Sequence, residues 1–170
     1  LRASFLLAEI AFEEEKWGEA SLYYDKVIQA PLNEYSEQAL VRITQALVQL
    51  EEKEKALSFW QKLESIAQYD ENKRYAQFNL MQYYFEEQSL EDAIAYAEKI
   101  LALTELEERV KWDAYYILAK AAQERKDVPK ATKAFKALEK APQGERAVEA
   151  LYFDALQKHN DLKFAASNKV

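Results

Sequence analysis

The stretch that decides the fold is residues 5–27, FLLAEIAFEEEKWGEASLYYDKV. Within it, Ala20 is preceded thirteen residues earlier by Leu7 and is followed by Tyr24 and Val27. An alanine with comparable neighbours recurs at Ala56, Ala93, Ala131 and Ala165. The spacings between these alanines are 36, 37, 38 and 34 residues. A period of this length indicates a repeat of one small unit, whose apolar face is buried only when copies stack on one another.

Each unit reads as a pair of helices. Apolar residues recur with a period of about 3.6 residues, interrupted by short polar joints. The first helices of the five pairs are predicted over residues 1–14, 36–51, 72–87, 108–125 and 145–159. The second helices are predicted over residues 17–30, 53–67, 90–104, 128–141 and 161 to the end. Joints this short place successive helices antiparallel, side by side.

Cap and turn residues support these divisions. Asp127 is suited to cap the helix that follows, whose first turn tolerates Pro129. Ser89 begins a sequence that is similar to a capping box. Asn160 and Asp161 predict a turn that separates the last two helices. Only two glycines and three prolines occur in 170 residues, which argues against a β-rich or disordered chain.

The pattern resembles that of the tetratricopeptide repeat family over essentially the whole chain. In the first copy the matching positions are Leu7, Ala8, Ala20, Tyr24, Val27 and Pro31, with Trp17 in the apolar slot before the alanine. The resemblance implies an all-α, right-handed α-solenoid of antiparallel helix pairs. A HEAT-like array is the alternative fold, because it also stacks helix pairs at a somewhat longer period.

The resemblance also implies the domain organisation. We expect one array over residues 1–170, with repeats over about 1–35, 36–71, 72–107 and 108–144 and a partial repeat over 145–170. Because the sequence opens and closes within helical patterns, we expect it to be an excerpt of a longer protein.

Tetratricopeptide arrays bind partners in a concave groove that is lined by their first helices. Carried over to this chain, the groove residues are Phe5, Glu9, Phe12, Gln45, Tyr75, Phe78, Gln82, Phe85, Tyr116 and Lys120. The same motif positions also hold Arg2, Glu13, Gln38, Val41, Val48, Gln49, Glu86, Asp113, Gln123 and Glu124. Aromatic side chains at such density are typical of a binding surface. The family's clamp for a C-terminal carboxylate needs basic and asparagine side chains where this chain has Phe5 and Glu9, so that clamp is absent. The alternative interpretation is that neighbouring helices cover these aromatic side chains.

Composition limits the chemistry. The chain has no cysteine, one histidine (His159, expected near a helix end) and no glycine-rich phosphate loop, so we predict no catalytic residue, no metal and no cofactor. A net charge of −7 argues against nucleic-acid binding, and no apolar run is long enough for direct membrane insertion. Residues 1–111 carry 12 basic and 22 acidic side chains, whereas residues 112–170 carry 11 and 8.

We therefore expect a non-enzymatic scaffold whose partner is another protein or peptide, bound through a basic or apolar segment that is extended or helical. One alternative is a structural spacer or a module for self-association through its end repeats, within a larger bacterial envelope or assembly protein. Another is an accessory domain of an enzyme whose chemistry lies elsewhere. A further surface is a row of lysines at Lys126, Lys130, Lys133, Lys136 and Lys140. It is either a solvated helix face or a contact for an acidic partner, a phosphate or a lipid headgroup.

Overall fold

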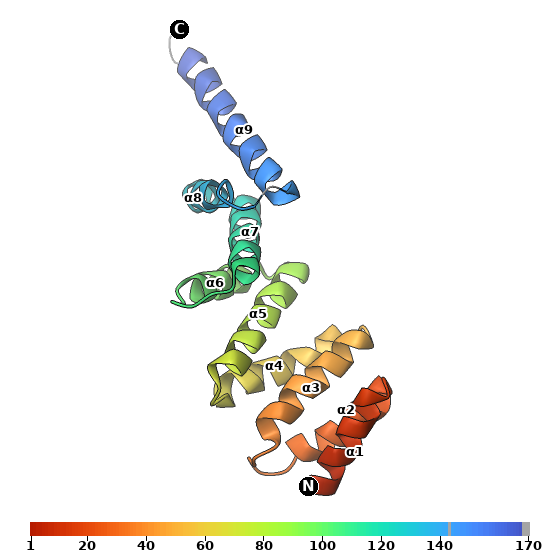
Figure 1. Ribbon diagram of the computed structural model, residues 1–170. Helices are drawn as coiled ribbons and strands as arrows, with labels where there is room; N and C mark the ends of the chain where they lie inside the picture. The colour runs from red at the N-terminus through yellow and green to blue at the C-terminus, as the bar shows by residue number, and fades with distance from the viewer. Residues whose placement is uncertain (143, 168–170) are drawn as a thin grey trace. The chain divides into compact units, whose positions relative to one another are not determined.

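A computed structural model describes residues 1–142 and 144–167, with the side chains of residues 145 and 161–167 left out. Within this range the chain forms nine helices and no strand (Figure 1). The helices are α1 (Arg2–Glu13), α2 (Trp17–Ile28), α3 (Ser36–Gln49), α4 (Lys53–Ile66), α5 (Asp70–Glu86), α6 (Leu90–Leu101), α7 (Glu108–Glu124), α8 (Val128–Leu138) and α9 (Glu145–Ser167). The predicted all-α class is confirmed. The first eight helices lie close to their predicted bounds, because the polar joints between apolar stripes are where the chain turns.

The prediction for the last repeat was wrong. A turn was expected at Asn160 and Asp161, but α9 continues as one helix through both residues to Ser167. Asn and Asp are weak helix formers, yet neither blocks the helical hydrogen bond as proline does, so propagation continues through them. His159 consequently lies inside a helix and is exposed, not at a helix end as expected.

The turn inside each of the first four pairs has the same backbone form. Each contains one residue other than glycine with positive φ; these are Glu15, Glu51, Gln88 and Lys126. The N–H of the next residue donates to a carbonyl five positions back, as from Lys16 to Ala11 at 2.9 Å. This 6→1 hydrogen bond is the mark of a Schellman cap. Each left-handed residue stands five positions before a repeat alanine, so the period seen in the sequence is also a period of the backbone.

The repeat alanines are buried as predicted. Ala20, Ala56 and Ala93 are 0 % exposed and Ala131 is 1 % exposed, while the side chain of Ala165 lies outside the described residues. A small side chain at these points lets neighbouring helices approach closely, because a larger one would hold them apart. Large side chains then fill the remaining volume, with Tyr24 and Trp60 among the most buried.

The chain divides into two compact units, residues 1–83 and residues 84 onward, with the boundary inside α5. In the first unit α1 packs on α2, α2 on α3 and α3 on α4; in the second unit α6 packs on α7, α7 on α8 and α8 on α9. Helices that are adjacent in sequence are thus adjacent in space within each unit. None of the described helices combines the length and the apolar character that crossing a bilayer requires.

The two predicted caps had different outcomes. The Asp127 carboxylate accepts a hydrogen bond from the Lys130 N–H at 3.2 Å, and Pro129 lies in the first turn of α8 as expected. Ser89 is the N-cap of α6, but its side chain makes no capping hydrogen bond, so the capping box was a wrong prediction.

Two helices, α1 and α9, each leave several large apolar side chains in solvent. On α1 these are Leu6, Leu7 and Ile10, and on α9 they are Val148, Leu151, Tyr152 and Leu156. Leu7 is 46 % exposed, whereas Ile43, at the same repeat position in α3, is 2 % exposed. The difference arises because α2 packs against α3, and no described helix packs against this face of α1.

Candidate functional site

Three of the expected groove residues, Phe5, Glu9 and Phe12, belong to a cluster that joins α1, α2 and α3. Phe5 is buried and lies edge-on to Tyr24, with ring centroids 6.1 Å apart. The Tyr24 hydroxyl donates a hydrogen bond to the Glu9 carboxylate. The Arg42 guanidinium lies 4.6 Å from the centre of the Phe12 ring. These side chains contact one another, so their interacting groups are not free to bind a ligand.

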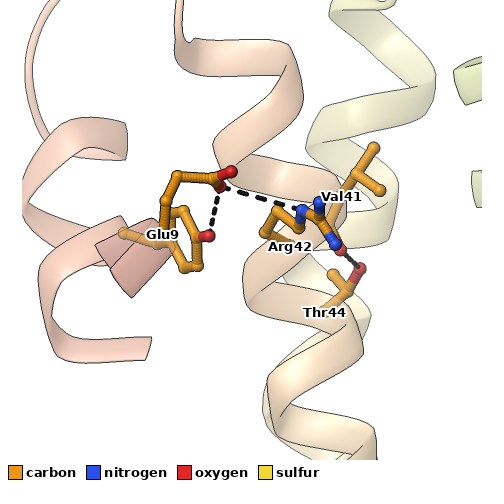
Figure 2. Close-up of polar contacts among 5 residues, drawn as sticks. Glu9, Val41, Arg42 and Thr44 are labelled. Carbon is orange, nitrogen blue, oxygen red and sulfur yellow. Dashed lines mark hydrogen bonds and ion pairs between the residues drawn. The ribbon is translucent and has the colours of Figure 1, made fainter. Parts of the chain in front are cut away.

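Glu9 is the centre of the polar part of this cluster. It accepts from the Tyr24 hydroxyl and also faces Arg42, whose Nε lies 3.7 Å from a Glu9 carboxylate oxygen (Figure 2). Burial raises the pKa of Tyr24 above its usual range, and the hydrogen bond to Glu9 raises the pKa further. Tyr24 therefore remains a neutral donor at ordinary pH, and the cluster is a structural tie between consecutive repeats.

The third repeat contributes Tyr75, Phe78, Gln82 and Phe85, all of them half-buried. The Tyr75 hydroxyl lies 3.1 Å from the Thr44 hydroxyl. Thr44 itself donates to the Val41 carbonyl at 2.8 Å (Figure 2). Burial raises the pKa of Tyr75. Half-burial leaves each of these side chains an exposed part that a partner can contact.

The expected residues of the fourth repeat pair with α9. Lys120 Nζ lies 2.6 Å from a Glu149 carboxylate oxygen, and this hydrogen bond raises the pKa of Lys120. The Arg146 guanidinium lies 5.2 Å from the centre of the Tyr116 ring, and burial raises the pKa of Tyr116. Tyr116 and Lys120 thus form contacts between consecutive first helices, α7 and α9.

Gln45 and two other expected groove residues, Gln38 and Val41, line a pocket. This pocket, of about 770 Å³, is formed by the α2–α3 loop, one face of α3, the α4–α5 joint and the start of α5. Its lining residues are Leu32, Asn33, Glu34, Glu37, Gln38, Val41, Arg42, Gln45, Ile66, Gln68, Tyr69 and Asn72. The volume is within the range of ligand sites in proteins. We call it the α3 pocket.

The α3 pocket is rigid at one wall and apolar at its rim. The Glu37 carboxylate accepts from the backbone N–H groups of Gln68 and Tyr69, both at 3.2 Å, and from the Asn72 amide at 2.9 Å. These hydrogen bonds fix the α4–α5 joint against α3. The side chains of Leu32 and Tyr69 are 68 % and 69 % exposed, so large apolar surfaces stand beside polar ones.

Two glutamines of α3 contribute polar groups to the α3 pocket. Gln38 is exposed, and the Oε1 atom of Gln45 is buried without a hydrogen-bond partner among the described residues. A buried acceptor without a hydrogen bond lowers the stability of the folded chain, and a hydrogen bond from a donor group would remove this cost. Glu34 and Glu37 supply two carboxylates against the single guanidinium of Arg42, which already faces Glu9. The pocket therefore favours a positively charged or hydrogen-bond-donating guest.

The sequence missed several lining residues, Glu34, Glu37 and Tyr69 among them. They lie before or at the start of a first helix, outside the positions that the repeat motif assigns to the groove. Two exposed apolar residues beside a helix start, Leu32 and Tyr69, were the available signal. Among the described residues, no three His, Asp or Glu side chains gather in a way that could hold a metal ion.

No protein-family model matches the chain, and no curated protein matches it either.

Proposed function

We propose that this protein is a non-enzymatic binding scaffold of the tetratricopeptide type, which holds a peptide or helical segment of another protein against its first helices. The observation that carries the proposal is the α3 pocket, because three of its lining residues, Gln38, Val41 and Gln45, are groove positions implied by the family resemblance. A right-handed superhelix of the repeats is part of the same proposal.

The chemistry of the α3 pocket favours a guest with a basic side chain next to an apolar one. Glu34 and Glu37 attract a cation, and the exposed rings and chains of Tyr69 and Leu32 offer apolar contact area. Glutamine side chains can pair with the backbone of an extended peptide without regard to its charge. The guest class is thus a short segment in which lysine or arginine alternates with apolar residues.

The test uses peptides selected from a displayed random library on the intact chain. Synthetic copies of the enriched peptides are then titrated by fluorescence anisotropy against two variants of equal charge. Gln38→Arg places a cation in the α3 pocket from an exposed position, whereas Ser58→Arg places the same charge on the exposed face of α4. We expect Gln38→Arg to weaken binding at least about tenfold, and Ser58→Arg to change it by less than about twofold.

Equal affinities of the two variants would contradict the assignment of the α3 pocket. Enrichment of acidic peptides instead of basic and apolar ones would contradict the proposed guest class.

A second candidate function, self-association of a structural module, is favoured by the exposed apolar side chains of α1. Leu6, Leu7 and Ile10 lie on one face of α1. The equivalent face of α3 is covered by the preceding helix, α2. A second copy of the chain would bury this face. Light scattering at several concentrations tests it: mass should rise with concentration in the native chain and not in a Leu7→Gln variant.

A further inference from the structure

The second unit contains a pocket of about 360 Å³ between the start of α7 and the α8–α9 loop. Its described lining residues are Arg109, Trp112, Ala141, Pro142, Gly144 and Arg146. We call it the α7 pocket. Two of these residues are cationic and none of them is acidic, which is the opposite of the α3 pocket.

The two pockets occupy the same place in the repeat. Glu34 and Arg109 both stand 22 residues before their repeat alanine, and Glu37 and Trp112 both stand 19 residues before theirs. The same position thus carries a carboxylate in one pocket and a guanidinium in the other. Because the surrounding backbone plan is shared, the exchange changes the charge of the guest that each pocket favours.

The two arginines of the α7 pocket have N–H donors that make no hydrogen bond within the described part of the chain. Arg109 is exposed and has no ion pair within the described part of the chain. Arg146 donates to the buried carboxylate of Asp113 and lies over the Tyr116 ring. A guanidinium has five N–H donors in a planar fork, so the contact with Asp113 leaves others for a second carboxylate. Asp113 also holds the Arg146 side chain in place before a guest arrives.

Trp112 gives the α7 pocket an aromatic wall. Its Nε1 atom is buried and has no hydrogen-bond partner among the described residues. Lys111 Nζ lies 4.7 Å from the centre of the Trp112 ring, and its charge is paired with the Glu108 carboxylate at 3.5 Å. Pro142 and Ala141 complete an apolar wall that suits an aliphatic side chain.

We propose that the α7 pocket binds a carboxylate side chain of an acidic peptide, flanked by an apolar residue. The carboxylate pairs with Arg109 and Arg146, and the apolar neighbour packs on Trp112 and Pro142. This site is separate from the α3 pocket and favours the opposite charge, so either can fail without the other.

The experiment follows the indole N–H signals of the intact, isotope-labelled chain by NMR. The probe is the pentapeptide Ala-Leu-Glu-Leu-Ala, acetylated and amidated at its ends, and its control contains Gln in place of Glu. The three tryptophans give three signals, of which Trp112→Phe identifies one. We expect the Glu peptide to shift the Trp112 signal in a saturable way, with little change at Trp17 and Trp60, and the Gln peptide to bind about tenfold more weakly.

Two charge reversals complete the design. Arg109→Glu should weaken the Glu peptide at least about tenfold, whereas Lys133→Glu, an equal change at an exposed position of α8 outside the pocket, should leave it within about twofold. Arg109→Gln should give an intermediate loss. Equal binding of the Glu and Gln peptides, or equal effects of the two reversals, would overturn the proposal. A Trp112 shift by inorganic phosphate as large as that by the peptide would overturn the peptide assignment in favour of a free oxyanion.

Discussion

Removal of one hydroxyl group tests the tie between the first two repeats. In Tyr24→Phe the ring, which is 0 % exposed, keeps its packing, and only the hydrogen bond to Glu9 is lost. A hydrogen bond to a charged group contributes about 1.5–3 kcal/mol, and the Glu9 side chain is 26 % exposed. Solvent screening reduces the expected loss in the free energy of unfolding to about 1–2 kcal/mol.

The neighbouring Tyr23→Phe is the matched control. Tyr23 is half-buried with Lys26 over its ring, and no hydrogen bond of its hydroxyl is found in the described residues, so its loss should be below about 0.5 kcal/mol. The measurement is urea unfolding, together with amide exchange in α1–α3, because a two-unit chain need not unfold in one step.

A double-mutant cycle of Tyr24→Phe with Glu9→Leu isolates the pair. We expect a coupling energy of about 1 kcal/mol between these two side chains. The reasoning fails if Tyr24→Phe destabilises the chain no more than Tyr23→Phe, or if the coupling energy is near zero.

Three further predictions concern the packing and the backbone. Ala93→Glu buries a charge at a close helix contact and should lower the free energy of unfolding by more than about 3 kcal/mol, as measured by thermal unfolding. Ala95→Glu, on the exposed face of α6, should change the free energy of unfolding by less than about 0.5 kcal/mol. Burial raises the pKa of Tyr24 and Tyr75, so above pH 10.0 these hydroxyls lose their protons in the unfolded chain before they do so in the folded chain. The free energy of unfolding should therefore fall above pH 10.0, and less steeply in Tyr24→Phe. A flat pH profile would contradict this prediction. Gln88→Gly should raise the unfolding free energy by about 0.5–1 kcal/mol, because glycine adopts the positive φ of 60° without strain; a loss of stability would count against the cap.

Local structure was largely predictable because it is encoded by neighbours in the sequence. The period of apolar residues located α1 to α8, and the aspartate at residue 127 was correctly expected to cap α8. Ser89 was not a side-chain cap, because a residue type that can accept the N–H hydrogen bond need not turn its hydroxyl toward it. Asn160 and Asp161 did not interrupt α9, since weak helix formers end a helix only when tertiary contacts stabilise a turn at that point.

The candidate site was only partly predictable. Gln45 was expected in the groove and lines the α3 pocket. Glu37 and Arg109 were not predicted as lining residues, because in the sequence each is an ordinary charged residue near a helix start. Which partner a charged side chain meets depends on segments some 30 residues away, as when Glu37 binds the N–H groups of the α4–α5 joint. Sequence spacing does not report such contacts.

By itself the sequence determined the first eight helices, their period and the burial of Ala20, Ala56, Ala93 and Ala131, because a small residue at a helix crossing is a local requirement repeated in these four units. The tertiary structure alone decided which faces are covered. Leu7 and Ile43 are equivalent in pattern, yet Leu7 is exposed and Ile43 is buried, since among the described helices one packs on that face of α3 and none packs on that face of α1. It also decided that the same repeat position presents a carboxylate to one pocket and a guanidinium to another.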